Sequence, residues 1–210
     1  MQSHILGLVL IFSLASAQQS AAQETVQLNI RDVMERPADL YEVESSVSGV
    51  VMVPQSGLKA DSWKALARQL NAQSISALAL NFTSVEDVST GIDFLLSSGV
   101  KDIGLIGGSV GGASILKLIN KNEYPQVRWA IFLGTGDGNS IESENVRKIF
   151  VVAENDMFAG QTYSSFRKAS EPKELIVLSG SEHGQNLFDG PQKERLERHI
   201  FSFLDDKIKP

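Results

Sequence analysis

The chain has 210 residues, carries a formal net charge of −6 and contains no cysteine. This length suits one domain with a sizeable core, and the acidic balance argues against nucleic acid or an anionic membrane surface as the partner. Without cysteine the chain can form no disulfide, no thiolate metal site and no cysteine nucleophile.

Residues 1–22 have the pattern of a secretory signal peptide. Ile5 to Leu14 is a short apolar run, and Ala15-Ser16-Ala17 after it matches the A-x-A cleavage pattern, with a similar site at 20–22. The run is too short to span a bilayer comfortably. We therefore expect a single domain over 23–210 that is exported to the periplasm or secreted and makes no membrane contact in its mature form.

Apolar strand-like runs and amphipathic stretches follow each other along the rest of the chain, which hydrophobic periodicity assigns to strands and helices. The predicted strands are 25–30, 41–47, 49–53, 75–82, 103–106, 127–133, 148–153 and 174–178; the predicted helices are about 61–70, 85–98, 110–120, 141–146, 160–169 and 191–207. Strict alternation from residue 49 onward predicts right-handed crossovers and a mostly parallel sheet. The expected fold class is α/β, a three-layer α/β/α sandwich.

The most informative stretch lies between the 103–106 strand and the helix after it. Residues 107–112 there read Gly-Gly-Ser-Val-Gly-Gly, which puts Ser109 in a Gly-x-Ser-x-Gly frame. A strand, a tight turn and a helix around a serine form the setting of a nucleophile elbow, whose strained backbone needs neighbours without a Cβ. The Val110 amide would open the helix and face developing negative charge. The alternative is a glycine-rich helix start that only packs closely on its strand.

A serine hydroxyl needs a base to take its proton, and histidine is the natural choice. The chain has three histidines: His4 lies in the predicted signal peptide and His199 in the predicted last helix. His183 alone follows a predicted strand, so we take it as the candidate base.

The base in turn needs an acid, which in this topology follows a strand between the serine and the histidine. Asp156, after the 148–153 strand, meets this requirement. Glu154, two residues earlier, and Asp137, one strand earlier, remain open as alternatives, and each of the three could be an ordinary turn carboxylate. Since the carboxyl ends of parallel strands share one edge, we expect Ser109, His183 and the acid to lie there together.

Cofactor sites find little support. A phosphate loop needs lysine and then serine or threonine after its last glycine, where this chain has Ala113-Ser114. A dinucleotide fingerprint ending at Gly111 needs glycine where Ile106 stands. With two histidines and no cysteine after residue 22, a metal site is also poorly supported. We therefore expect no cofactor and no metal.

From about Gly49 to the end, the chain resembles a small α/β-hydrolase. The 107–112 elbow carries most of the resemblance, and the helix expected at 85–98 resembles the one that precedes the nucleophile strand in dienelactone-hydrolase-like serine esterases. The resemblance implies an α/β-hydrolase fold and a serine hydrolase of carboxylesterase or thioesterase type. Its triad would be Ser109, His183 and Asp156, acting on a small acyl substrate. Dienelactone hydrolases proper use cysteine, so the chain is not one in the narrow sense.

The resemblance also implies a second oxyanion amide from the loop after the 49–53 strand, opposite that of Val110. By position the donor is the Ser56 amide, with the Gln55 amide as the alternative. Gln55 stands where relatives often carry glycine, so a fold-keeping binding protein with weak or no catalysis is the alternative function. The loop after Leu133 is about as long as an ordinary connection, which predicts a site without a lid.

Overall fold

The computed structural model describes residues 23–31, 33–135, 137 and 139–205. The predicted signal peptide lies outside these described residues and stays a prediction. Among the described residues, no helix combines the length and the apolar character that crossing a membrane requires.

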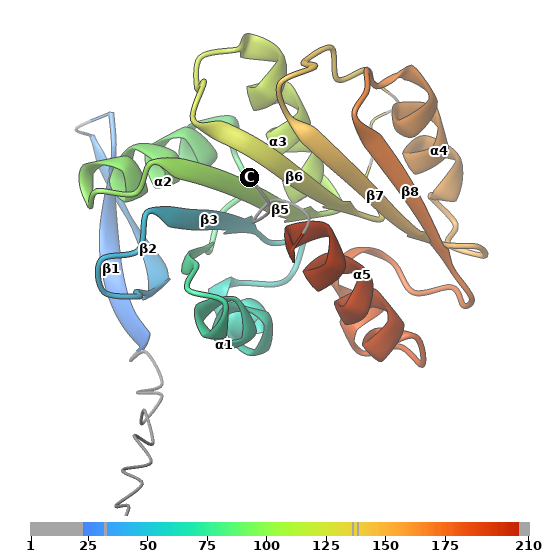
Figure 1. The fold of residues 1–210 in the computed structure, drawn as a ribbon, viewed down its shortest axis with the longest axis horizontal. Coiled ribbons are helices and arrows are strands. Elements are labelled where there is room, and N and C mark those ends of the chain that lie inside the picture. Colours follow the sequence, from blue (N-terminus) through green and yellow to red (C-terminus); the bar gives the residue numbers. More distant parts are fainter. Residues whose placement is uncertain (1–22, 32, 136, 138, 206–210) are drawn as a thin grey trace, which may run out of the picture.

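One sheet of eight strands runs through the described part of the chain, in the order β1-β2-β4-β3-β5-β6-β7-β8 (Figure 1). The strands are β1 Gln23–Ile30, β2 Met34–Tyr41, β3 Ser48–Val53, β4 Ser76–Leu80, β5 Asp102–Gly108, β6 Val127–Leu133, β7 Arg147–Ala153 and β8 Lys173–Leu178. β1 pairs antiparallel with β2, and β2 with β4, whereas the pairs from β4 to β8 are parallel. The mostly parallel sheet predicted from the sequence is confirmed.

Helices cover both faces of this sheet (Figure 1). The α-helices are α1 Lys64–Ala72, α2 Val85–Ser97, α3 Val110–Lys121, α4 Ala159–Lys168 and α5 Lys193–Asp205, and short 3₁₀ turns span Ala60–Trp63 and Gly184–Phe188. One buried cluster joins the sheet to α2 and α3, and a second joins it to α1 and α5. These two cores make the three-layer α/β/α sandwich.

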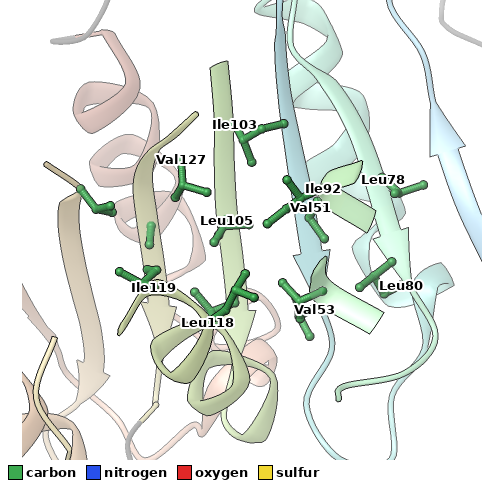
Figure 2. Packing of buried hydrophobic residues seen from close by; sticks show 14 of the residues in the cluster. Val51, Val53, Leu78, Leu80, Ile92, Ile103, Leu105, Leu118, Ile119 and Val127 are labelled. Atoms are coloured by element: carbon green, nitrogen blue, oxygen red, sulfur yellow. The ribbon is translucent and has the colours of Figure 1, made fainter. Parts of the chain in front are cut away.

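The central strands are buried on both faces, as a continuous apolar run requires. In β3, Val51 and Val53 pack in the cluster under α2 and α3, whereas Val50 and Met52 belong to the cluster under α1 and α5. Figure 2 shows the first of these clusters, with Val51 and Val53 next to side chains of neighbouring strands and of α2 and α3. All four side chains are fully buried.

The strand predicted at 41–47 is wrong: the second strand is β2, which ends at Tyr41. Its charged residues and Pro37 hid it, because proline and aspartate are depleted in strands. Asp39 is accommodated because Gln23 and Thr25 of β1 donate hydrogen bonds to its carboxylate (2.8 and 3.3 Å). Pro37 lies one residue before the stretch of β2 that pairs with β4, so its lack of an amide hydrogen removes no hydrogen bond to that strand.

The helix predicted at 141–146 is also wrong, because tertiary partners take its backbone groups. The Ile141 carbonyl accepts from the Ser170 amide (2.8 Å), and the Glu142 amide donates to the Asn120 side chain (3.3 Å). The described residues between β6 and β7 contain no helix. The helix predicted from residue 61 begins instead as the 3₁₀ turn and continues as α1.

Lys148 of β7 binds the segment 141–146 through two of its backbone carbonyls. Its side chain is fully buried, and its ammonium donates to the carbonyls of Ser143 and Val146 (2.6 and 2.7 Å). Burial lowers the pKa of Lys148 from 10.5 to about 8, and the charge of Glu171 offsets part of this effect. A buried cation with a lowered pKa makes the stability depend on pH.

The sign of that dependence follows from proton binding. Between the folded pKa of about 8 and the unfolded value of 10.5, the unfolded chain holds a proton that folded Lys148 has released. We expect the free energy of unfolding of the wild type, minus that of Lys148→Met, to rise across this window by at most about 1.4 kcal/mol per pH unit. Urea unfolding at several pH values measures it. A difference that stays flat or falls would contradict the assignment.

Candidate active site

Ser109 stands at the turn between β5 and α3, with φ 48° and ψ −115°. A positive φ is costly for a residue with a side chain and persists only when the surroundings hold it. Here the Ser109 amide donates to the carbonyl of Leu133 at the end of β6 (3.0 Å). Thr135, just beyond that strand, donates its hydroxyl to the carbonyls of Leu133 and Gly107 (3.1 and 3.3 Å). The end of β6 therefore supports the strained turn.

Close backbone contacts explain the glycines around Ser109. A Cβ on Gly111 would lie 2.5 Å from the Pro54 carbonyl oxygen, and one on Gly107 would lie 2.6 Å from the Gly112 nitrogen. A Cβ on Gly112 would overlap the side chain of Thr135. Three glycines thus let α3 approach the ends of β3, β5 and β6, and the predicted need for small residues has a steric cause.

The structure brings Ser109, His183 and Asp156 into one hydrogen-bonded array. His183 Nε2 lies 2.8 Å from Ser109 Oγ, and His183 Nδ1 lies 2.8 Å from Asp156 Oδ2. The Asp156 side chain is fully buried, whereas that of His183 is 24% exposed. With an ionised Asp156, the partners assign the proton to Nδ1, which leaves Nε2 to accept from the serine hydroxyl.

Asp156 is itself held in place by its own turn. Its second oxygen, Oδ1, accepts from the amide of Phe158 (2.8 Å), and its backbone carbonyl accepts from the amide of Ala159 at the start of α4 (2.9 Å). With Oδ1 held in this way, the other oxygen, Oδ2, faces His183. The orientation of the carboxylate is therefore set by the backbone that follows it.

The alternatives kept from the sequence lie elsewhere. Glu154 and Asp137 are exposed, and Asp137 caps the nearby amide of Asn139 (3.0 Å). His199 lies on α5, half-buried. The contact with His183 is made by Asp156.

The candidate oxyanion donors also differ in their partners. The Gln55 amide already donates to the side-chain oxygen of Gln185 (2.6 Å). The amides of Ser56 and Val110 donate to no acceptor in the part of the chain that the structure describes. Val110 opens α3, so its amide lies at the positive end of the helix dipole. Of the two loop amides, that of Ser56 is the one left free.

Several residues at the site were not singled out from the sequence: Gly134, Thr135, Phe158 and Gln185. Gly134 has φ 52°, and a Cβ there would lie 2.6 Å from the Gly184 nitrogen and 3.2 Å from Asp156 Oδ2. Gly134 could have been indicated by its place directly after a strand at the edge that carries the site. Phe158 could have been indicated by Asp156 two residues earlier, because an aspartate often accepts from the amide two residues on.

Exposed apolar side chains border the array. Val110 is 44% exposed, Met157 85% and Phe158 43%, and the Phe158 ring lies 5.0 Å from the His183 ring. We call these three residues the apolar rim. The described residues hold no cluster of three or more histidine, cysteine, aspartate or glutamate side chains that could bind a metal ion.

Neither a family model nor a curated protein matches the sequence. Among solved structures, a dienelactone hydrolase from Anabaena variabilis superposes with a TM-score of 0.72 at 13% identity, over 87% of this chain and 96% of that one. An esterase from Pyrococcus furiosus gives 0.71 at 14% identity, over 89% and 93%.

The chain has the α/β-hydrolase fold. A dienelactone hydrolase-like promiscuous phosphotriesterase from metagenomic libraries shares this fold as well, with a TM-score of 0.69 at 15% identity, over 88% of this chain and 98% of that one. The structural resemblance expected from the elbow sequence is thereby confirmed. Within the α/β-hydrolase fold, Ser109 occupies the turn after the fifth strand, at the carboxyl edge of the parallel strands.

The glycine contacts lead to a stability prediction. We expect Gly111→Ala to lower the free energy of unfolding by about 3 kcal/mol or more, because its Cβ meets backbone oxygens that cannot move without shifting β3. Gly160→Ala at the start of α4 is the matched control, since its Cβ meets nothing within 4 Å, and should change stability by less than about 1 kcal/mol. Urea unfolding measures both, and equal effects would contradict the steric account.

Proposed function

We propose that this protein is an exported serine hydrolase that cleaves an ester or thioester of a small acyl substrate. The observation that carries the proposal is the pair of 2.8 Å contacts from His183, one to Ser109 Oγ and one to Asp156 Oδ2. A base within hydrogen-bond reach of the serine, oriented by a buried carboxylate, is the arrangement that activates a hydroxyl nucleophile.

The chemistry follows from these positions. His183 Nε2 takes the Ser109 proton as the oxygen attacks the acyl carbonyl, and the amides of Val110 and Ser56 donate to the resulting oxyanion. One such donor typically stabilises the transition state by about 3 kcal/mol. His183 then gives its proton to the departing alcohol or thiol. Water repeats the sequence on the acyl-enzyme and releases the acid.

The apolar rim supports an apolar acyl or alcohol group on the substrate. Phe158 exposes part of its ring beside His183, and Met157, its neighbour in the chain after Asp156, is largely exposed. Such apolar surface is costly in water and favourable against a ligand. The structural neighbours agree with an ester substrate, because two of them are named as a dienelactone hydrolase and an esterase. The pattern of residues 1–22 supports export, so we assign the enzyme to the periplasm or the extracellular space.

A fluorophosphonate probe tests the nucleophile. We expect the wild type to be labelled and Ser109→Ala to be inert, because the probe reacts only with a serine whose proton is removed and whose oxyanion is stabilised. Ser114→Ala, one turn along α3, is the matched control and should be labelled like the wild type. Unlabelled wild-type protein would favour the alternative of a binding protein that keeps the fold.

The base is tested by the turnover of p-nitrophenyl acetate in two histidine variants. His183→Ala should lose at least about 1000-fold in kcat, whereas His199→Ala should retain wild-type turnover. Normal turnover in His183→Ala would sink the triad assignment.

Met157 tests the role of the apolar rim. Because the side chain is 85% exposed, Met157→Gln should not affect folding. We expect kcat/KM for p-nitrophenyl hexanoate to fall about fivefold, the equivalent of about one lost methylene contact, with little change for the acetate. Met34→Gln, at a half-exposed methionine in β2, is the control and should change neither. An equal loss on both esters would contradict a role in acyl binding.

A further inference from the structure

Two loops at the site edge are joined by a reciprocal pair of hydrogen bonds. The Gln55 amide donates to the side-chain oxygen of Gln185 (2.6 Å), and the Gln185 amide donates to the side-chain oxygen of Gln55 (2.7 Å). Gln55 belongs to the loop after β3, and Gln185 follows His183 in the loop after β8. Each glutamine thus donates its backbone amide to the other and accepts with its side-chain oxygen. We call this pair the glutamine clasp.

The Gln185 side chain is held at both of its polar ends. It is buried, with its residue only 4% exposed, and its Nε2 donates to the hydroxyl of Ser62 (2.8 Å) in the 3₁₀ turn before α1. A Cβ on Gly108 of the elbow would lie 3.1 Å from Gln185 Cγ. The side chain therefore lies between the elbow, the loop after β3 and the turn that leads into α1.

Gln55 is held on the opposite side of the clasp. A Cβ on Gly184, which has φ 59°, would overlap the Gln55 side-chain oxygen and lie 3.5 Å from the Ser109 nitrogen. Gln55 Nε2 also donates to the Asn186 side chain (3.4 Å). The segment that carries His183 is thus packed against Gln55 directly beside the elbow.

We propose that Gln185 and Gln55 are positioning residues that keep the oxyanion loop and the histidine loop in fixed relation to Ser109. The inference rests on the proposed serine hydrolase function. Gln185 occupies the Gln55 amide, so the loop offers its next amide, that of Ser56, to the oxyanion. Gln55 in return holds the Gly184–Gln185 peptide, one residue beyond His183. The residue that departs from the usual glycine is therefore part of the site and not a defect in it.

Glutamine suits this task for a chemical reason. Each loop presents a backbone amide that needs an acceptor, and a neutral carboxamide supplies one without placing a negative charge beside the developing oxyanion. Methionine has nearly the same length and shape but no comparable acceptor. Gln→Met at either position thus removes the hydrogen bonds made by that side chain, with little change of volume.

Steady-state kinetics of Gln185→Met, Gln55→Met and the double variant test the clasp. Because an oxyanion donor acts in the transition state, we expect each single variant to lose about 10- to 100-fold in kcat with KM changed less than about twofold. Since the two residues act as a unit, the double variant should lose no more than the worse single one. Gln69→Met is the matched control: it breaks a glutamine contact with Glu197 between α1 and α5 (3.2 Å) and should retain wild-type kcat.

Hydrogen exchange separates this proposal from the proposed function. The Gln55 amide should be protected in the wild type and lose protection in Gln185→Met, whether or not the protein turns over an ester. A wild type that fluorophosphonate does not label, with this exchange pattern, would end the hydrolase proposal and with it the catalytic purpose of the clasp. Labelled wild type with unchanged kcat in Gln185→Met, additive losses in the double variant, or an equal loss in Gln69→Met would overturn the clasp alone.

Discussion

The backbone of Ser109 is the constraint on which the site depends. Its φ of 48° is unfavourable for a residue with a side chain. The turn keeps this conformation because the end of β6, α3 and the loop after β3 contact it closely. Leu133 accepts the Ser109 amide, and Gly107 and Gly111 admit the backbones of α3 and of the loop after β3. Removing the space at either glycine would move α3, whose first amide is the proposed oxyanion donor.

The parallel sheet turns this local constraint into a site. Because parallel strands end at one edge, the loops after β3, β5, β7 and β8 meet there although they are far apart in the chain. Asp156 reaches His183 from the loop after β7, and Gln55 reaches Gln185 across 130 residues. The hydrogen bonds between loops fix the loops relative to one another. In the proposed reaction, the amide donors would then need no reorganisation in the transition state.

Sequence patterns predicted those parts of the fold in which local preference and tertiary environment agree. Strand β6 was predicted with its observed bounds, 127–133, because a strand buried on both faces is apolar throughout. The sequence patterns gave wrong predictions where tertiary partners override the local preference. β2 forms around Pro37 and Asp39 because β1 satisfies the carboxylate, and 141–146 is not helical because Ser170 and Asn120 take its backbone groups.

The sequence by itself determined the elbow at Ser109 and the order of serine, acid and histidine, because glycine spacing and strand-following position are local properties. It left Asp156, Glu154 and Asp137 as competing acids. Only the tertiary structure decided which of these carboxylates contacts His183, since that contact depends on how separate loops meet. The partner of Gln55 was decided in the same way: a glutamine's hydrogen bonds are set by what packs against it, and Gln185 is adjacent only after folding.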